Sequence, residues 1–297
     1  MAEEIKADTA KPPKAENPKP KAGAGIDIAS IGGLALALGG ILGGLLIEGG
    51  RLKDVAQFTA AMIVLGGTIG AVMISTPLPI VIGAAKRFAG VFRDNNKPMN
   101  EMLELVIGYA TKARKNGLVS LEHEAEQIQD PFLKKALNLA VDGTDLQELR
   151  KMLELEMEIE EQHLEAEAKV FESAGGYAPT VGIIGAVLGL IQVMKNLANI
   201  EEVGHGIAVA FVATVYGVGT ANLLFLPAAS KIKARFTQEM HRKELIIEAV
   251  SGIVEGLNPK LIRMKLEAFA PPEPAKKPAA VKEKAGAARE KPDPVKA

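Results

Sequence analysis

Hydroxyl and amide side chains stand inside two long apolar stretches of this 297-residue chain, and they are the groups best placed to contact an ion. Residues 173–194 contain Thr180 and Gln192. Residues 206–230 contain Thr214, Tyr216, Thr220 and Asn222. Side-chain oxygens of this kind can line an ion path, although a threonine in a membrane helix more often bonds a carbonyl of its own helix.

Small residues accompany these polar groups. On a helix, one face of residues 206–230 is a narrow track of small side chains with a single hydroxyl, formed by Ala210, Thr214, Gly217 and Ala221. Glycine is also frequent in the two apolar stretches nearer the N-terminus, where close packing of helix backbones explains it without a further role. In residues 173–194 and 206–230, the small residues could serve either helix packing or an ion path, and both explanations stay open.

The interiors of the apolar stretches lack ionisable groups. Residues 28–47, 55–85, 173–194 and 206–230 contain no Asp, Glu, Lys or Arg, and His205 lies at an end. Proton and ion carriers usually place a carboxylate or histidine within the membrane, because a titratable group there acts as a relay. If this chain helps to move protons, the proton-binding group must come from another polypeptide. The pattern therefore favours a channel wall around a partner helix over a self-contained transporter.

Other chemistry finds little support. The chain has no cysteine, and its four histidines form no ligand pattern, so we expect no metal site and no cofactor. The acidic run "ELEMEIEEQHLEAEAK" is expected to be the solvated face of an amphipathic helix. No nucleophile–base pair or phosphate loop indicates an enzyme. A formal net charge of -1 argues against a nucleic-acid binder.

The elements that position these groups are predicted to be helices. Each charge-free stretch supplies the ~20 apolar residues that cross a bilayer, so the sequence predicts an all-α membrane protein with four transmembrane helices. Basic residues cluster after the second and fourth stretches, which places both termini and the middle segment in the cytoplasm. The expected divisions are a disordered tail (1–25), a first transmembrane hairpin (26–85), a cytoplasmic helical domain (86–172), a second hairpin (173–230), C-terminal helices (231–270) and a disordered tail (271–297).

Capping signals divide the middle segment. Gly117 is expected to end a first helix and Ser120 to begin a second. Asp130-Pro131 starts a third, which Asp142-Gly143-Thr144 breaks. From Asp145 the apolar spacing is regular and predicts one long helix that runs directly into the third membrane span.

Three segments make the sequence resemble the A subunits of bacterial flagellar motor stators (MotA and PomA), within the MotA/TolQ/ExbB proton-channel family. They are "GGYAPTVGIIGAVLGLIQVM", "FVATVYGVGTANLLFLPAASKIK" and "GLNPKLIRMKLEAF". The resemblance covers about residues 26–270, and the order of spans and domains also matches. It implies a multi-pass protein of the bacterial inner membrane, in a homo-oligomeric ring of five around two single-pass B-subunit helices. The partner's Asp would bind the ion, and the cytoplasmic domain would push on the rotor's switch complex.

The resemblance also assigns roles to single residues. Pro179 and Pro227 match prolines linked to coupling of ion flow and movement, although a proline in a membrane helix often merely kinks it. Thr214 matches a threonine beside the ion path, and Ala186 matches the position that faces it. Sodium-driven relatives carry threonine there, so a proton is the expected ion and sodium the less favoured one.

Arg114 and Glu122 match charges that engage the rotor. A simpler explanation is that each complements a helix dipole, since Arg114 lies in a last turn and Glu122 in a first turn. Two other functions stay open: an ExbB/TolQ-type subunit that energises envelope transport, and a non-conducting membrane scaffold. The ExbB/TolQ relatives have three spans and an external N-terminus, which differs from the pattern expected here. The tails at both ends are longer than the family pattern and receive no role.

Overall fold

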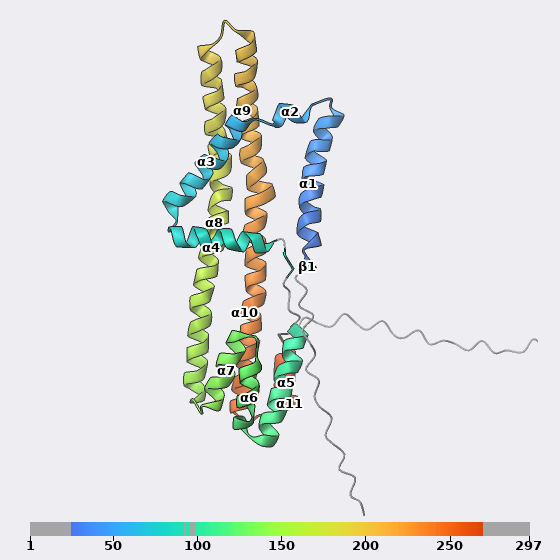
Figure 1. Ribbon diagram of the computed structural model, residues 1–297, viewed down its shortest axis with the longest axis vertical. Coiled ribbons are helices and arrows are strands. Elements are labelled where there is room, and N and C mark those ends of the chain that lie inside the picture. The colour runs from blue at the N-terminus through green and yellow to red at the C-terminus, as the bar shows by residue number, and fades with distance from the viewer. Residues whose placement is uncertain (1–24, 92, 95–98, 270–297) are drawn as a thin grey trace, which may run out of the picture.

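The computed structural model describes residues 25–91, 93–94 and 99–269, and both predicted tails lie outside these residues. The described residues are almost entirely helical. Two long antiparallel rods form the axis of the molecule (Figure 1): α8 (Leu146–Lys195) is one, and α9 (Ile200–Thr220), the π-helical turn η2 (Ala221–Phe225) and α10 (Leu226–Val254) together form the other. The prediction that the helix starting at Asp145 runs into the third span is confirmed, because α8 continues for 50 residues without a break.

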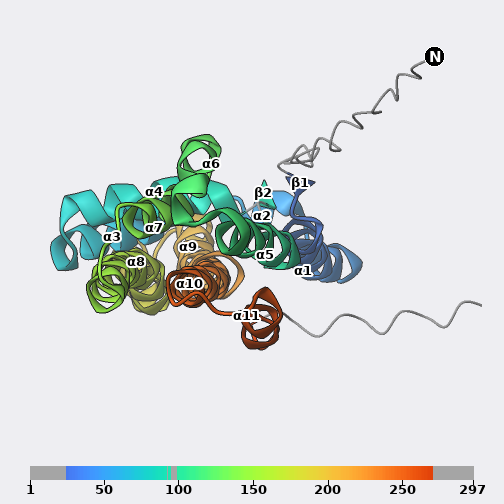
Figure 2. The same cartoon turned by 90° about the horizontal axis from the view of Figure 1, so that it is seen from below.

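The first two spans flank this axis. α1 (Ile28–Ile47) and α3 (Phe58–Ser75), joined through the short helix α2 (Leu52–Val55), lie on opposite sides of the long rods (Figure 2). Four helices in the described part of the chain are long and apolar enough to cross a membrane: Ile28–Ile47, Leu52–Ser75, and parts of Leu146–Lys195 and Ile200–Val254. The predicted four-span, all-α architecture is confirmed.

The second span is shorter than its apolar run. α3 ends at Ser75, because Thr76 precedes Pro77 and takes an extended conformation, as residues before proline do. A separate helix, α4 (Leu78–Val91), then lies across the axis (Figure 1). Residues 55–85, expected as one span, therefore form a membrane helix and most of a transverse helix.

The remaining helices form a second core at the lower end of the rods. They are α5 (Met99–Asn116), η1 (Leu118–Leu121), α6 (Glu122–Gln127), α7 (Pro131–Val141) and α11 (Pro259–Leu266). Leu103, Val106, Leu133 and Leu149 are among the residues buried there, against Leu245 and Ile246 of α10. Three predicted boundaries hold: Gly117 has φ +82° after α5, Asp130 caps α7, and Asp145 caps α8. Ser120 lies within the 3-10 turn η1 rather than capping a helix.

A pair of two-residue strands departs from the all-helical expectation. β1 (Gly25–Ile26) pairs antiparallel with β2 (Arg93–Asp94), which ties the chain before α1 to the chain after α4. This pairing brings the start of the first span beside the end of the transverse helix.

Glycines serve different purposes in the two hairpins. In the α8–α9 hairpin a Cβ added at Gly182 would lie 2.9 Å from the Ala213 carbonyl oxygen, so the two backbones touch. In α1 a Cβ at any glycine would meet nothing within 4 Å, and none of its residues is buried. The packing expected for the glycines of α1 therefore has no counterpart within the described part of this chain.

Candidate functional site

The α8–α9 hairpin brings the predicted path residues to one level. Gly182 lies against Gly217, and the helices run antiparallel. Ala186 is one turn beyond Gly182, and Thr214 is one turn before Gly217, so the two lie within about 2 Å of each other along the axis. Both are partly buried on the side where the helices meet. The structure thus brings Ala186 and Thr214 to one level of the hairpin, and their place beside an ion path stays a prediction.

The threonine hydroxyls of α9 and the neighbouring Asn222 amide are satisfied within their own helical segment. Thr214 Oγ1 donates to the Ala210 carbonyl at 3.1 Å, and Thr220 Oγ1 donates to that of Tyr216 at 2.7 Å. Asn222 Nδ2 donates to the Val218 carbonyl at 2.9 Å. These side chains therefore bond carbonyls of their own helix, which is the simpler of the two roles considered from the sequence. A hydroxyl that donates to its own backbone keeps lone pairs available as acceptors.

The two prolines lie apart. Pro179 is one turn from the Gly182–Gly217 contact, whereas Pro227 lies about 10 Å further along the axis, toward α4. Pro227 also explains η2. Its ring excludes the carbonyl of residue 223 and it has no N–H, so the helix widens and the Leu226 N–H bonds the Ala221 carbonyl, five residues back.

Tyr216 anchors the second span to this hairpin, a contact that the sequence analysis missed. Its hydroxyl donates to the Val55 carbonyl at 2.5 Å and accepts the Gln57 N–H at 3.3 Å. These two groups sit in the break between α2 and α3, where the helical ladder is interrupted. An aromatic residue with a polar tip inside an apolar span was the available signal.

A charge cluster anchors the first span, and it too was missed. Asp27 caps α1 by accepting the Ser30 N–H at 3.1 Å, and its carboxylate is paired with Lys231 and Arg235 of α10. Arg235 also donates to the Gly90 and Val91 carbonyls at the end of α4. The cluster therefore joins α1, α4 and α10 at one point.

The hydrogen bond from Lys231, followed by that from the Ser30 N–H, lowers the pKa of Asp27 to about 2. A lowered pKa means that the anchor stabilises the fold above the usual aspartate pKa and is lost only as the pH falls toward 2. Asp27 thus stays ionised throughout the physiological range. In the sequence, Lys231 and Arg235 belong to the basic residues after the fourth apolar stretch, which indicated only the orientation of the spans.

Arg114 and Glu122 lie at a corner of the lower domain. Arg114 is in the last turn of α5 and Glu122 in the first turn of α6, with η1 between them, and both are exposed. Val119 of η1 is 69% exposed between them. Lys112 and Glu124 pair across the same corner and fix its shape. The corner presents opposite charges around an apolar side chain, far from Thr214 and Ala186.

Known proteins share this arrangement over most of the chain. Residues 124–245 match the MotA/TolQ/ExbB proton channel family, and residues 31–117 match the family described as Motility protein A N-terminal. The chain is 36% identical to motility protein A of Bacillus subtilis (strain 168), over 83% of this chain and 92% of that protein.

Solved structures agree with the sequence matches. The fold is similar to a chain of C. jejuni MotAB, with a TM-score of 0.80 and 34% identity, over 84% of this chain and 97% of that one. It is also similar to a chain of the flagellar MotAB stator complex from Bacillus subtilis, with a TM-score of 0.76 and 36% identity, over 82% and 96% of the two chains. The chain belongs to the MotA/TolQ/ExbB proton channel family.

Proposed function

We propose that this chain is the A subunit of a flagellar motor stator, which forms a proton-conducting complex with a B subunit and turns ion flow into torque on the rotor. One observation carries the proposal: the interiors of four membrane spans contain no ionisable residue, yet the chain belongs to a proton channel family. A channel wall without a relay group needs one from another chain. Similarity to MotAB complexes supports a B subunit as that chain.

The exposed apolar surface supports assembly into a ring with partner helices. Leu188, Ile191 and Phe211 of the α8–α9 hairpin are exposed in the single chain, as are Leu36 and Ile41 of α1. Within a bilayer such faces can contact lipid or other helices. We propose a ring of five copies around two single-pass helices, in the bacterial inner membrane, with both termini cytoplasmic. Lys86, Arg87 and Lys231 at one end of the spans support this orientation.

An ExbB/TolQ-type function is a less specific match to this chain than the stator function. Residues 31–117, which cover most of the first span and all of the second, match the family model described as Motility protein A N-terminal. Relatives of the ExbB/TolQ type would not need this added hairpin.

The proposed ion is the proton. Ala186 offers no oxygen beside Thr214, and a sodium ion needs several oxygen ligands, whereas a proton needs only the partner's carboxylate. We expect swimming speed to follow the proton-motive force and to be independent of external Na⁺. Speed is measured by tracking cells over a range of Na⁺ concentrations at constant proton-motive force, with Ala186→Thr as the comparison variant. A speed that rises with Na⁺ in the unaltered protein would overturn proton drive.

Charge reversal at the α5–α6 corner tests the torque function itself. Arg114→Glu should strongly reduce swimming, because it reverses the charge that the proposed rotor contact uses, while the stator complex still assembles. A charge reversal on the rotor should restore part of the motility. Lys151→Glu, an equal change at an exposed position of α8, is the matched control and should swim normally. An Arg114→Glu strain as motile as the control would contradict rotor contact at this corner.

A further inference from the structure

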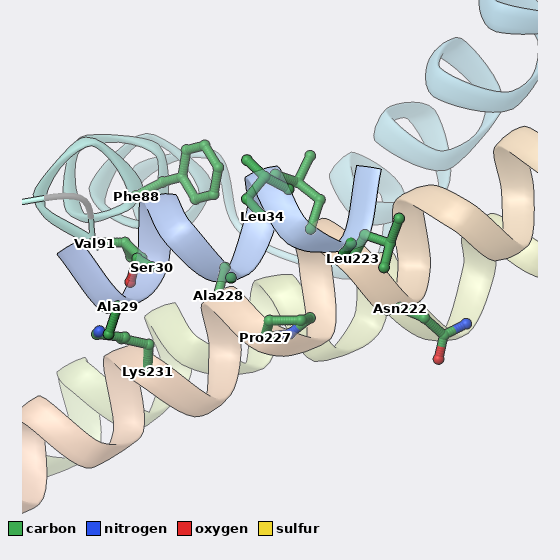
Figure 3. A pocket seen from close by; sticks show the side chains of 13 residues that line it. Ala29, Ser30, Leu34, Phe88, Val91, Asn222, Leu223, Pro227, Ala228 and Lys231 are labelled. Atoms are coloured by element: carbon green, nitrogen blue, oxygen red, sulfur yellow. The ribbon is translucent and has the colours of Figure 1, made fainter. Parts of the chain in front are cut away.

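A cavity of about 330 Å³ lies between α1, α4 and the η2–α10 segment (Figure 3). Gly33 and Ala37 of α1 form one wall, and Pro227 and Ala228 form the opposite one. These small side chains leave the space open, since a Cβ at Gly33 would meet no atom within 4 Å. The volume is that of a pocket for a small molecule or for part of a lipid.

The cavity is apolar in its depth and charged at one end. Most of its lining consists of carbon, whereas Lys231 closes the end nearest the anchor of α1. There Lys231 and Arg235 share the single carboxylate of Asp27, so two cations face one anion and the cluster carries a net charge of +1. The end with the positive charge is also where α4 lies across the rods.

Its position decides which occupants are possible. The lining residues of α1 belong to a membrane span, so the cavity lies at the edge of the apolar zone. Water is unstable in an apolar cavity, and the surrounding solvent there is lipid. An acyl chain gains little free energy by moving from the bilayer into an apolar cavity. Any selectivity between lipids must therefore come from the charged end. A net positive cluster at the cytoplasmic surface attracts anionic headgroups.

We infer that this cavity binds one acyl chain of an anionic phospholipid of the cytoplasmic leaflet, with the phosphate beside Lys231. The lipid fills the space between α1 and the π-helical turn η2 that Pro227 widens. It joins the first span to the rest of the chain, to which α1 is otherwise fastened through Asp27 and β1. The inference goes beyond the proposed motor function and does not depend on rotor contact.

Native mass spectrometry of the purified complex with its B subunit tests the site. The complex is equilibrated with equal amounts of phosphatidylglycerol and phosphatidylethanolamine, and retained lipids are counted per copy of this chain. The unaltered protein should retain one phosphatidylglycerol per copy. Gly33→Leu with Ala37→Leu fills the cavity and should abolish that retention. Gly32→Leu adds the same side chain on another face of α1, outside the lining of this cavity, and should retain the lipid.

Two charge variants separate lipid binding from simple anchoring. Lys231→Gln removes one positive charge and should lower the preference for phosphatidylglycerol about fivefold, while Lys231→Arg keeps it. Asp27→Asn keeps the cap of α1 but raises the net charge, and should increase the preference about fivefold. If the cluster only held α1 in place, both variants would lose lipid together. That outcome would overturn the inference, and so would equal retention of the two lipids. Unchanged retention in the cavity-filling variant would also overturn it, as would a helix of a neighbouring copy that fills the space in place of lipid.

Discussion

Gly217→Ala should abolish motility, although it adds one methyl group to a residue that lies within a membrane span. A Cβ at position 217 would lie 2.6 Å from the Ala178 carbonyl oxygen and 3.0 Å from the Cα of Gly182. Both are backbone atoms of α8, so no side-chain rotation can relieve the clash, and the two helices must separate. Overpacking of this kind costs about 1–3 kcal/mol in soluble cores. In a membrane, close backbone packing is itself a main source of helix association.

Gly219→Ala is the matched control for this change. It lies two residues further along, and its added Cβ would meet nothing within 4 Å. Both substitutions raise intrinsic helix propensity by the same amount, about 1 kcal/mol, so only the packing differs. Swarm diameter in soft agar and the amount of protein in the membrane fraction measure the outcome. Equal motility of the two variants would show that the α8–α9 contact does not hold the channel wall together.

Asp130→Ala should destabilise the lower domain by about 3–5 kcal/mol, because it removes two kinds of interaction at once. Asp130 is 7% exposed, and its Oδ1 accepts the N–H groups of Phe132 and Leu133 at 3.1 Å each. Its other carboxylate oxygen pairs with Arg242 of α10. Without Asp130 the Arg242 guanidinium would remain in a largely buried place with no partner carboxylate. The thermal midpoint of the purified complex, followed by circular dichroism, measures the loss.

Asp145→Ala is the comparison for the loss of stability, since Asp145 caps a helix but takes part in no buried ion pair. Asp145 accepts the Gln147 N–H at 2.9 Å at an exposed site, so its loss should cost about 1 kcal/mol. The double change Asp130→Asn with Arg242→Met keeps the cap and removes both charges, and it should recover most of the stability. Equal shifts for Asp130→Ala and Asp145→Ala would mean that the buried pair contributes nothing.

Local signals in the sequence predicted most of the helices and their ends. Asp130 and Asp145 start α7 and α8 because their carboxylates cap the first turns. Gly117 ends α5 with a positive φ because glycine has no Cβ. The four spans followed from the lengths of their apolar runs. These features depend on neighbours in the chain, and such neighbours are visible in a sequence.

Contacts between distant segments could not be predicted in the same way. Asp27 meets Arg235 across 208 positions, and no local pattern pairs them. The Thr76-Pro77 signal that ends α3 was present, but the absence of charge up to residue 85 concealed it. Gly40 and Gly182 look alike in sequence, yet only Gly182 packs against this chain. Which partner a small residue contacts depends on the assembly and not on its neighbours.

The roles of Pro179, Ala186, Thr214 and Pro227 are still predictions from the family resemblance. The structure gives them positions: three lie around the Gly182–Gly217 contact, and Pro227 lies below it beside the cavity. Pro227 thus lies beside the widened turn η2 and away from Thr214.

Proton flux in sealed vesicles tests most directly whether this chain borrows its proton-binding group. Vesicles containing the purified chain alone are compared with vesicles containing the chain and its B subunit, under the same membrane potential and with a pH-sensitive dye inside. Acidification should occur only when both chains are present, and it should vanish when the membrane carboxylate of the B subunit is replaced by its amide. Proton entry into vesicles that hold this chain alone would contradict the account.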